Sequence, residues 1–360
     1  MENKLIKQNL LDFTPEELQT LMAAKGQKPY RAAVLFKWLH SGAEFSEMSD
    51  FPLPLREELD GEYFAQSVKI REKFLSKDGT AKYLFGLNGG QLIESVLMSY
   101  TAGNTLCVSS QAGCRMGCVF CASGADGLFR SLSAGEILGQ IAAVNRELGG
   151  TARDRKIQNV VLMGSGEPLD NYEAVTKFLR LVMDNRGLNL GQRCISLSTC
   201  GIAPKIRRLA DDGFTINLTV SLHSGFNEER NAMMPINKSY PVEDVMSAAR
   251  YYFDKTGRRV MLEYTLIKGK NMRPADVLKL KNLSRGFPCH INLILLNPIE
   301  GSDMKAPTRD EAEKFKGSLE ALGVLCTVRR ALGSDIGGAC GQLRSHYMTS
   351  QNEVPNGMKK

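Results

Sequence analysis

The stretch Leu106-Cys107-Val-Ser-Ser-Gln-Ala-Gly-Cys114-Arg-Met-Gly-Cys118-Val-Phe-Cys121 joins an apolar, strand-like run to a loop with three cysteines. Their Cys-x3-Cys-x2-Cys spacing lets one short loop aim three thiolates at one point. Thiolates are soft ligands that suit iron–sulfur clusters and zinc. A [4Fe–4S] cluster normally takes four cysteines. Three would leave one iron open to chelate the amino and carboxylate groups of a molecule such as S-adenosylmethionine (SAM).

The alternative for this loop is a structural zinc site in a non-enzymatic RNA-binding protein. Structural zinc needs four ligands in regular clusters. No fourth cysteine or histidine follows at a finger-like spacing, and the next histidine along the chain is His223. The pattern therefore favours one [4Fe–4S] cluster held by Cys114, Cys118 and Cys121.

Strand-like and helix-like segments alternate from residue 105 onward. The strands are expected at residues 105–109, 159–163, 194–198, 216–221, 260–267, 290–296 and 325–328. The capping box Ser133-Ala-Gly-Glu136 opens a helix expected at 133–148. Regular alternation predicts a parallel sheet with helices outside. Six to seven such units are too few for a closed eight-stranded barrel, so the α/β fold is predicted to be a partial barrel.

The chain before this barrel divides into two smaller parts. Thr14 is a good N-cap before Pro15, and a second helix is expected at 31–40, so residues 1–60 are predicted to form a helical accessory domain. Residues 61–99 alternate like short antiparallel connecting strands, with turn signals at 77–79 and 88–90. Residues 100–335 form the expected core, and residues 336–360 form a C-terminal segment.

The composition sets broad limits on the function. The chain has 360 residues, of which 43% are hydrophobic, and it shows no long apolar run and no basic-then-apolar leader. Nine cysteines are an odd number and do not resemble a secreted disulfide framework. We therefore expect a cytoplasmic protein without a membrane partner. The net charge of +7 is mild evidence for an anionic partner.

Polar residues stand where several of the predicted strands end, which is where α/β folds bind their ligands. Gly166 lets the backbone approach a ligand closely, and Glu167 can accept hydrogen bonds from an ammonium group such as that of SAM. Taken singly, each polar residue is more often a cap or a turn residue. Together they predict a ring of donors and acceptors around one mouth. The other members are Ser198, Ser221, Leu222, His223 and Asn297.

Two further cysteines differ in their surroundings. Cys107 lies on an apolar strand, where a cysteine is usually inert packing. Cys340 lies in the glycine-flanked run 337–343, which predicts a compact, mobile loop with an exposed thiol. The remaining cysteines are expected to be packing residues, and they are Cys194, Cys200, Cys289 and Cys326.

The motifs in their order resemble the radical-SAM adenine methyltransferases, the family of the RlmN and Cfr enzymes. The similarity runs from about Glu94 to Leu343, and the N-terminal helices resemble the accessory domain of the family. The motifs are the run 106–121, Gly166-Glu-Pro168, Ser221-Leu-His223, Met234-Pro-Ile-Asn237 and Ala339-Cys-Gly-Gln-Leu343.

The resemblance implies a partial (β/α)6 radical-SAM barrel and a role for each residue. Cys340 takes a methyl group from one SAM, and a second SAM yields a radical that activates this methyl for addition to adenine. Glu94 is the expected base, and Cys107 then releases the product by forming a disulfide with Cys340. The residues implied to bind SAM are Gly166, Glu167, Ser198, Ser221, Leu222, His223 and Asn297.

The resemblance also implies the substrate and partners. It indicates methylation of carbon 2 of an adenine in 23S rRNA, with tRNA as a second candidate, by a monomer that takes electrons from a donor such as flavodoxin. The alternative is a Cfr-like enzyme that methylates carbon 8 and confers antibiotic resistance. A radical-SAM activase would have no reason to keep both Cys107 and Cys340. From their positions alone, the candidate phosphate contacts are Lys25, Lys28, Arg31, Lys37, Arg258, Arg259, Arg329 and Arg330. Taken singly, each of these side chains is more often part of a solvated surface.

Overall fold

A ten-stranded sheet forms the centre of the protein. The structure is a computed structural model and describes residues 7–297, 299 and 302–343. The strand order is β14-β13-β12-β11-β10-β9-β6-β5-β4-β3, and pairing from β6 to β14 is parallel throughout. These parallel strands are β6 (Gly103–Cys107), β9 (Ile157–Leu162), β10 (Ile195–Thr199), β11 (Asn217–Ser221), β12 (Val260–Leu266), β13 (Cys289–Leu295) and β14 (Cys326–Val328).

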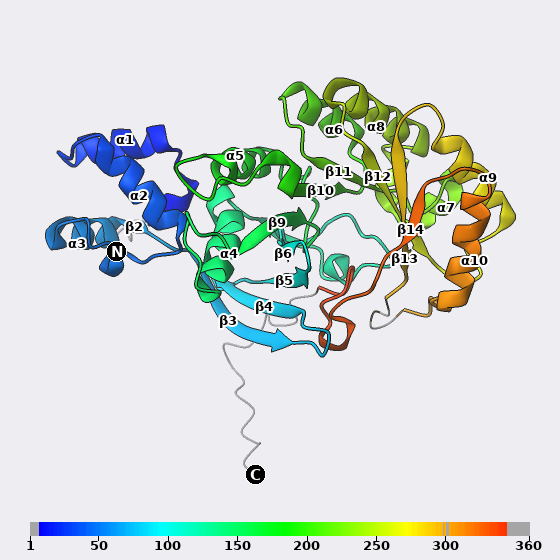
Figure 1. The fold of residues 1–360 in the computed structure, drawn as a ribbon, viewed down its shortest axis with the longest axis horizontal. Helices are drawn as coiled ribbons and strands as arrows, with labels where there is room; N and C mark the ends of the chain where they lie inside the picture. Colours follow the sequence, from blue (N-terminus) through cyan, green and yellow to red (C-terminus); the bar gives the residue numbers. More distant parts are fainter. Residues whose placement is uncertain (1–6, 298, 300–301, 344–360) are drawn as a thin grey trace, which may run out of the picture.

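Helices follow the parallel strands and lie along the outer side of the arc that the strands form (Figure 1). The sheet stays open, because β3 and β14 are its two edge strands. The expected partial barrel is confirmed, with its strands within one or two residues of the predicted bounds. The helices are α4 (Ala134–Glu147), α5 (Tyr172–Met183), α6 (Ala203–Asp211), α7 (Asn227–Met233), α8 (Val242–Thr256), α9 (Pro274–Leu283) and α10 (Arg309–Glu320).

The antiparallel strands β3 (Val68–Leu75), β4 (Ala81–Leu87) and β5 (Leu92–Tyr100) continue the main sheet. They were expected only as a connection between two domains. Strand β5 pairs antiparallel with β6, and Val96 lies opposite Cys107. Burial on β4 and β5 explains the difference, since their apolar side chains belong to the core shared with the barrel. The result is that Glu94 lies on the strand next to the one that carries Cys107.

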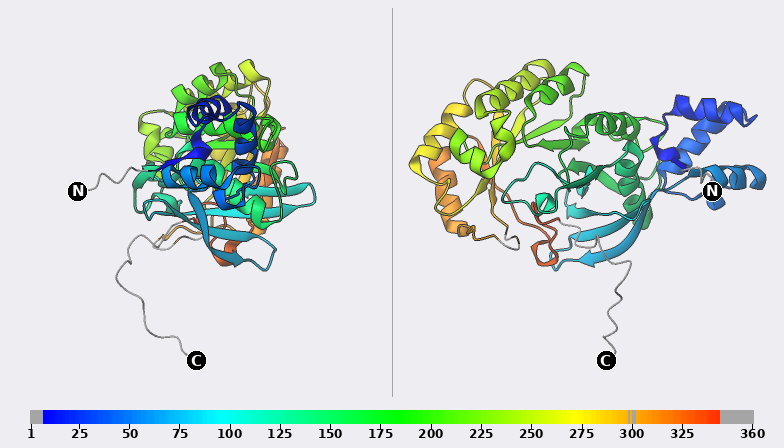
Figure 2. Two further views of the ribbon diagram at one scale, coloured as in Figure 1. Left: turned by 90° about the vertical axis from the view of Figure 1, so that its left-hand side faces the viewer. Right: turned by 180° about the vertical axis from the view of Figure 1, so that it is seen from behind.

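The N-terminal helices form one end of the molecule (Figures 1 and 2). They are α1 (Pro15–Ala24), α2 (Tyr30–His40) and α3 (Leu53–Glu62), and the strands β1 (Gln8–Asn9) and β2 (Tyr63–Phe64) form a short parallel pair beside them. Thr14 and Glu17 form the capping box of α1. The carboxylate of Asp12 accepts a hydrogen bond of 2.6 Å from the backbone N–H of Gly135, which connects this part to the start of α4.

A small hairpin lies beside the cysteine loop. Its strands β7 (Gln111–Gly113) and β8 (Leu128–Ser131) pair antiparallel and bracket the loop in the sequence. In the described part of the chain, no helix is both long enough and apolar enough to span a bilayer.

Candidate active site

The cysteine loop follows β6 and β7 at the carboxyl end of the parallel sheet, as predicted. The backbone N–H of Cys114 donates to the carbonyl of Gly127 at 2.9 Å, and the N–H of Cys121 donates to the carbonyl of Cys118 at 3.1 Å. Arg115 forms an ion pair with Asp170, which follows β9. The two backbone hydrogen bonds fix the loop internally, and the ion pair connects it to the segment after β9.

The three loop cysteines line one cavity of about 160 Å³ at the ends of the parallel strands. The pKa of the Cys114 thiol is raised to about 12, chiefly by burial and also by the neighbouring Glu167 and Cys121. Burial and the neighbouring thiols Cys121 and Cys114 likewise raise the pKa of Cys118. Within residues 7–297, 299 and 302–343, no three His, Cys, Asp or Glu side chains form a group that could hold a single metal ion. The thiols surround a shared space, and three soft donors around such a space fit an iron–sulfur cluster with one iron open.

Glu167 is placed in the same cavity by a glycine turn. Gly166 has a φ of +104°, and a Cβ there would lie 2.6 Å from the Cβ of Gln111, so only glycine fits without movement. The Glu167 carboxylate is buried and accepts hydrogen bonds from the backbone N–H groups of Cys200 at 2.7 Å and Leu169 at 3.0 Å. Burial raises its pKa, and these hydrogen bonds oppose that shift. Its remaining lone pairs can accept from a cationic ligand.

Four of the other predicted residues also line this cavity, and they are Ser198, Ser221, His223 and Asn297. His223 has a φ of +56°, a left-handed conformation that is uncommon for residues other than glycine. Its Nδ1 accepts from the backbone N–H of Thr265 at 3.0 Å, and its ring packs 4.5 Å from the ring centre of Phe120 in the cysteine loop. Burial, followed by the charge of Arg230, lowers its pKa to about 3, so the imidazole is neutral. Because Nδ1 accepts, Nε2 carries the proton and can donate it.

Leu222 differs from its neighbours. Its side chain is fully buried in the main hydrophobic core and is not among the residues that line the cavity. Its backbone carbonyl accepts from Nε of Arg230 at 3.0 Å. Successive side chains along an extended chain point to opposite faces. The side chain of Leu222, directly after β11, therefore points away from the face on which Ser221 lines the cavity.

Cys340 lies where the cysteine cavity meets a second, apolar cavity. It lines both of them, and Cys107 lines the second. Cys340 is exposed as a residue, as predicted, while Cys107 is buried. Burial raises the pKa of the Cys107 thiol to about 12, and the charge of Cys340 adds to this effect. The two thiols, 233 positions apart in the sequence, thus face a common space.

The loop that carries Cys340 is tied to its surroundings. The carbonyl of Gly341 accepts from the N–H of Ala122 at 2.7 Å, and Oγ of Ser123 donates to the carbonyl of Leu343 at 2.7 Å. The side-chain amide of Asn297 donates to the carbonyl of Cys340 at 2.9 Å. Asn297 lines both cavities. The cysteine loop and the end of β13 therefore position this segment together.

Glu94 lies on β5 and is buried. Its Oε1 forms an ion pair of 3.0 Å with Nζ of Lys82 on β4. Glu94 shares its face of β5 with Val96 and Met98, which line the cavity of Cys107. Lys82 lies 3.6 Å from the position that a Cβ on Gly337 would take, so the pair also reaches the base of the Cys340 loop.

Known proteins are similar in sequence to almost the whole chain. A family model described as "Radical SAM superfamily" matches residues 108–280. A second, "Ribosomal RNA large subunit methyltransferase N-terminal domain", matches residues 8–64. A "Probable dual-specificity RNA methyltransferase RlmN" from Clostridium botulinum is 46% identical over 345 residues, which cover 95% of this chain and 99% of that protein. The chain belongs to the RlmN family of radical-SAM RNA methyltransferases.

Two further relatives support this membership. The RlmN protein of Clostridioides difficile, with the same printed name, is 45% identical over 349 residues, covering 96% of this chain and 100% of the relative. A crystal structure of a radical SAM methyltransferase from Sphaerobacter thermophilus superposes with a TM-score of 0.90 at 40% identity, covering 94% of this chain and 99% of that one. The fold of this RlmN-family chain is therefore the radical-SAM fold.

Several residues of this RlmN-family site were not expected from the sequence. Glu263 on β12 lines the cysteine cavity and pairs with Arg329 at 3.0 Å. Burial raises the pKa of Glu263, and the charge of Arg329 opposes that shift. Cys200, expected to be packing only, lines the same cavity, and its N–H binds Glu167. The position of Cys200, two residues after the strand predicted at 194–198, was the one available signal.

Arg230 on α7 was also missed. It is completely buried and donates to the carbonyls of Cys200 at 2.6 Å and Ser221 at 3.0 Å and to Oδ1 of Asn237 at 2.8 Å. These bonds hold the ends of β10 and β11 in place beneath the cavity. The Met234-Pro-Ile-Asn237 motif thus has a structural reason, because its last residue accepts from the buried guanidinium.

Proposed function

We propose that this enzyme methylates carbon 2 of an adenine in 23S rRNA, with tRNA as a second substrate. The observation that carries the proposal is that Cys340 lines both the cavity of the three loop cysteines and the cavity of Cys107. A methyl carrier must meet the cofactor on one side and a resolving thiol on the other. The N-terminal match to a ribosomal RNA large subunit methyltransferase domain supports the rRNA substrate.

Cys114, Cys118 and Cys121 would hold one [4Fe–4S] cluster. Glu167, Gly166, Ser198, Ser221, Leu222, His223 and Asn297 would surround SAM, Leu222 through its backbone, with two SAM molecules consumed per methylation. When bound, the cluster and SAM supply the radical chemistry needed at a ring carbon that is not a nucleophile. The protein residues position these groups and exclude water.

The remaining roles fall to side chains of the chain itself. Cys340 carries the methyl carbon to the adenine, and Glu94 accepts the proton that the new carbon–carbon bond displaces. The Cys107 thiolate then attacks the Cys340 sulfur, so that a disulfide forms as the carbon–sulfur bond breaks. The released carbon keeps the bonding electron pair and takes up a proton, which completes the methyl group on the adenine. The shared cavity of the two thiols supports this last step.

The domain division 1–60, 61–99, 100–335 and 336–360 is part of the proposal, with the first domain binding RNA. Residues 344–360 of the last segment lie outside the described residues. We also propose a cytoplasmic monomer that takes electrons from a low-potential donor such as flavodoxin. A reducing compartment suits both the cluster and nine free cysteines.

Mass spectrometry of nucleosides from a deletion strain tests the substrate assignment. Loss of 2-methyladenosine from 23S rRNA, and from tRNA, is the expected result, and the intact gene should restore both. Loss of 8-methyladenosine instead would show the Cfr-like alternative. Unchanged adenine methylation in both RNAs would contradict the proposed function.

A further inference from the structure

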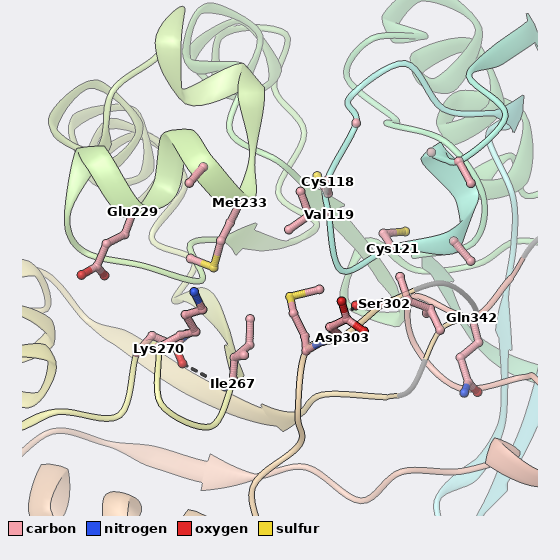
Figure 3. Close-up of a pocket in the computed structure, with 18 of the residues that line it drawn as sticks. Cys118, Val119, Cys121, Glu229, Met233, Ile267, Lys270, Ser302, Asp303 and Gln342 are labelled. Carbon is pink, nitrogen blue, oxygen red and sulfur yellow. Dashed lines mark hydrogen bonds between the residues drawn. The ribbon is translucent and has the colours of Figure 1, made fainter.

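A larger cavity, of about 920 Å³, lies in front of the cysteine loop (Figure 3). Its walls come from the cysteine loop, α7, the turn after β12, the segment around Met304, and the loop that carries Cys340. Gly337 and Gln342, which flank Cys340, line it, whereas Cys340 itself lines the two neighbouring cavities. An occupant would therefore lie next to the methyl-carrying loop.

One wall of this cavity is apolar. Val119 lies between two cluster cysteines and is 45% exposed, although it is a hydrophobic residue. Met233 on α7 and Ile267 directly after β12 line the same wall from beneath and are themselves buried, at 9% and 1% exposure (Figure 3). Apolar side chains that line a cavity beside a reactive site suit contact with an apolar part of a ligand. The flat face of an unstacked base is such a part.

Among the described residues, two cationic side chains line the cavity, and they are Arg273 and Lys270. Arg273 is paired with Glu229 and Asp276. Lys270 has no ion pair among the described residues, and its side chain points toward Met233 and the cavity (Figure 3). The carboxylate of Asp303 lies apart from it, near Ser302 in the same view. The Lys270 end of the cavity therefore offers a positive charge to an anion.

The backbone around Lys270 is held rigidly. The N–H of Lys270 donates to the carbonyl of Ile267 at 3.1 Å. Oδ1 of Asn271 accepts from the N–H of Ile267 at 2.9 Å, and its Nδ2 donates to the carbonyl of His223 at 2.8 Å. The Lys270 side chain thus extends from a turn whose backbone is fixed by hydrogen bonds, and Asn271 connects this turn to His223. A fixed starting point lowers the entropy lost on binding.

We propose that this cavity binds a nucleotide of the RNA strand that carries the target adenine. The base packs on the wall formed by Val119 and Met233, and Lys270 contacts a phosphate of the strand. The proposal rests on the proposed function and adds the place where the RNA strand enters. An apolar wall and one unpaired ammonium match the two chemical parts of a nucleotide, and phosphate contacts supply much of nucleic-acid affinity.

The test compares variants of two lysines on the same turn. Lys270→Ala removes the proposed phosphate contact, and Lys270→Arg keeps the charge. Lys268→Ala is the matched control, since the ammonium of Lys268 is already paired with Glu311 at 2.7 Å. The affinity of the cluster-loaded enzyme for a 23S rRNA fragment with the target adenine is measured across a salt series. Iron content and SAM affinity confirm that each variant is intact.

Lys270→Ala should weaken RNA binding severalfold and reduce the slope of log affinity against log salt by about one. Lys270→Arg and Lys268→Ala should bind RNA like the wild type. Unchanged affinity and slope in Lys270→Ala, with normal methylation by the wild type, would overturn this inference alone. Slower reduction by flavodoxin with unchanged RNA binding would also overturn it and assign the surface to an acidic protein. A wild type that neither binds nor methylates RNA would overturn the proposed function as well.

Discussion

The side-chain amide of Asn297 donates a hydrogen bond of 2.9 Å to the backbone carbonyl of Cys340. Asn297 follows β13, and Cys340 lies in the C-terminal loop 43 positions later in the sequence. A residue implied to bind SAM therefore also fixes the loop of the proposed methyl carrier. The contact connects the end of β13, beside the cysteine cavity, to the loop of Cys340.

Asn297→Ala should loosen this loop, because it removes a hydrogen bond worth about 1 kcal/mol. We expect Cys340 to react severalfold faster with iodoacetamide, as measured by peptide mass spectrometry. The buried Cys326 serves as the internal control, since its reactivity should stay the same. An unchanged rate at Cys340 would show that the other contacts of the loop suffice to hold it.

Replacement of Cys114, Cys118 or Cys121 by alanine should abolish the bound cluster, because three thiols are the minimum set for it. Iron content and visible absorbance of anaerobically purified protein measure the effect. Cys289→Ala is the matched control, since Cys289 is buried on β13 and lines none of the three cavities of the site. Full cluster retention in any one of the three loop variants would remove that cysteine from the ligand set.

Replacement of Cys340 and replacement of Cys107 should stop the reaction at different steps. Cys340→Ala should carry no methyl group and form no adduct with RNA. Cys107→Ala should still attack the RNA and then stall, so that the protein purifies with RNA bound through Cys340. Intact-protein mass spectrometry after nuclease digestion would show the nucleotide remnant. Normal turnover by Cys107→Ala, or a nucleotide remnant on another cysteine, would show that the assignment of roles to Cys107 and Cys340 is wrong.

Lys82→Met should destabilise the protein, because it leaves the carboxylate of Glu94 buried without its 3.0 Å cation. Breaking a buried ion pair on one side costs about 3 kcal/mol, and urea unfolding measures this loss. Lys82→Arg should keep most of the stability and the turnover rate. The double variant Lys82→Met/Glu94→Gln should recover part of the stability lost in the single variant. If the double variant is no more stable than Lys82→Met, the broken ion pair is not the cause of the lost stability.

His40 should make the stability depend on pH. It is the last residue of α2 and is buried against Gly187 and Leu188. Burial lowers its pKa to about 3 from an unfolded value of about 6.5. The unfolded chain therefore binds a proton below pH 6.5 while the folded protein does not. The contribution of His40 to the unfolding free energy is fully present above pH 6.5 and is lost as the pH falls toward 3.

Relative to His40→Gln, the wild type should lose up to about 1.4 kcal/mol of unfolding free energy for each pH unit in this window. Urea titrations of both proteins at several pH values measure the difference. Glutamine is chosen because its side chain can still accept from the N–H of Leu188, as Nδ1 of His40 does at 3.3 Å. Parallel stability curves for the two proteins would show that His40 does not titrate on unfolding.

The sequence alone determined those features whose interacting residues lie close together along the chain. The spacing of Cys114, Cys118 and Cys121 depends on one loop, and the cap formed by Ser133 and Glu136 depends on one helical turn. The alternation of strands and helices predicted the partial barrel for the same reason, because each element carries its own periodicity. The ends of the strands then located Glu167 and His223 without knowledge of the tertiary contacts.

The tertiary structure alone decided the contacts between distant segments. Lys82 on β4 meets Glu94 on β5, although the strand register places Val96 directly opposite Lys82. Arg329, directly after β14, reaches past β13 to Glu263 on β12. Both ion pairs therefore exist only once the strands have assembled into the sheet. The full burial of Arg230, and with it the support of the strand ends, depends on how α7 packs against β10 and β11. Such pairs leave no local pattern, since their free energy comes from desolvation and geometry that exist only after the chain has folded.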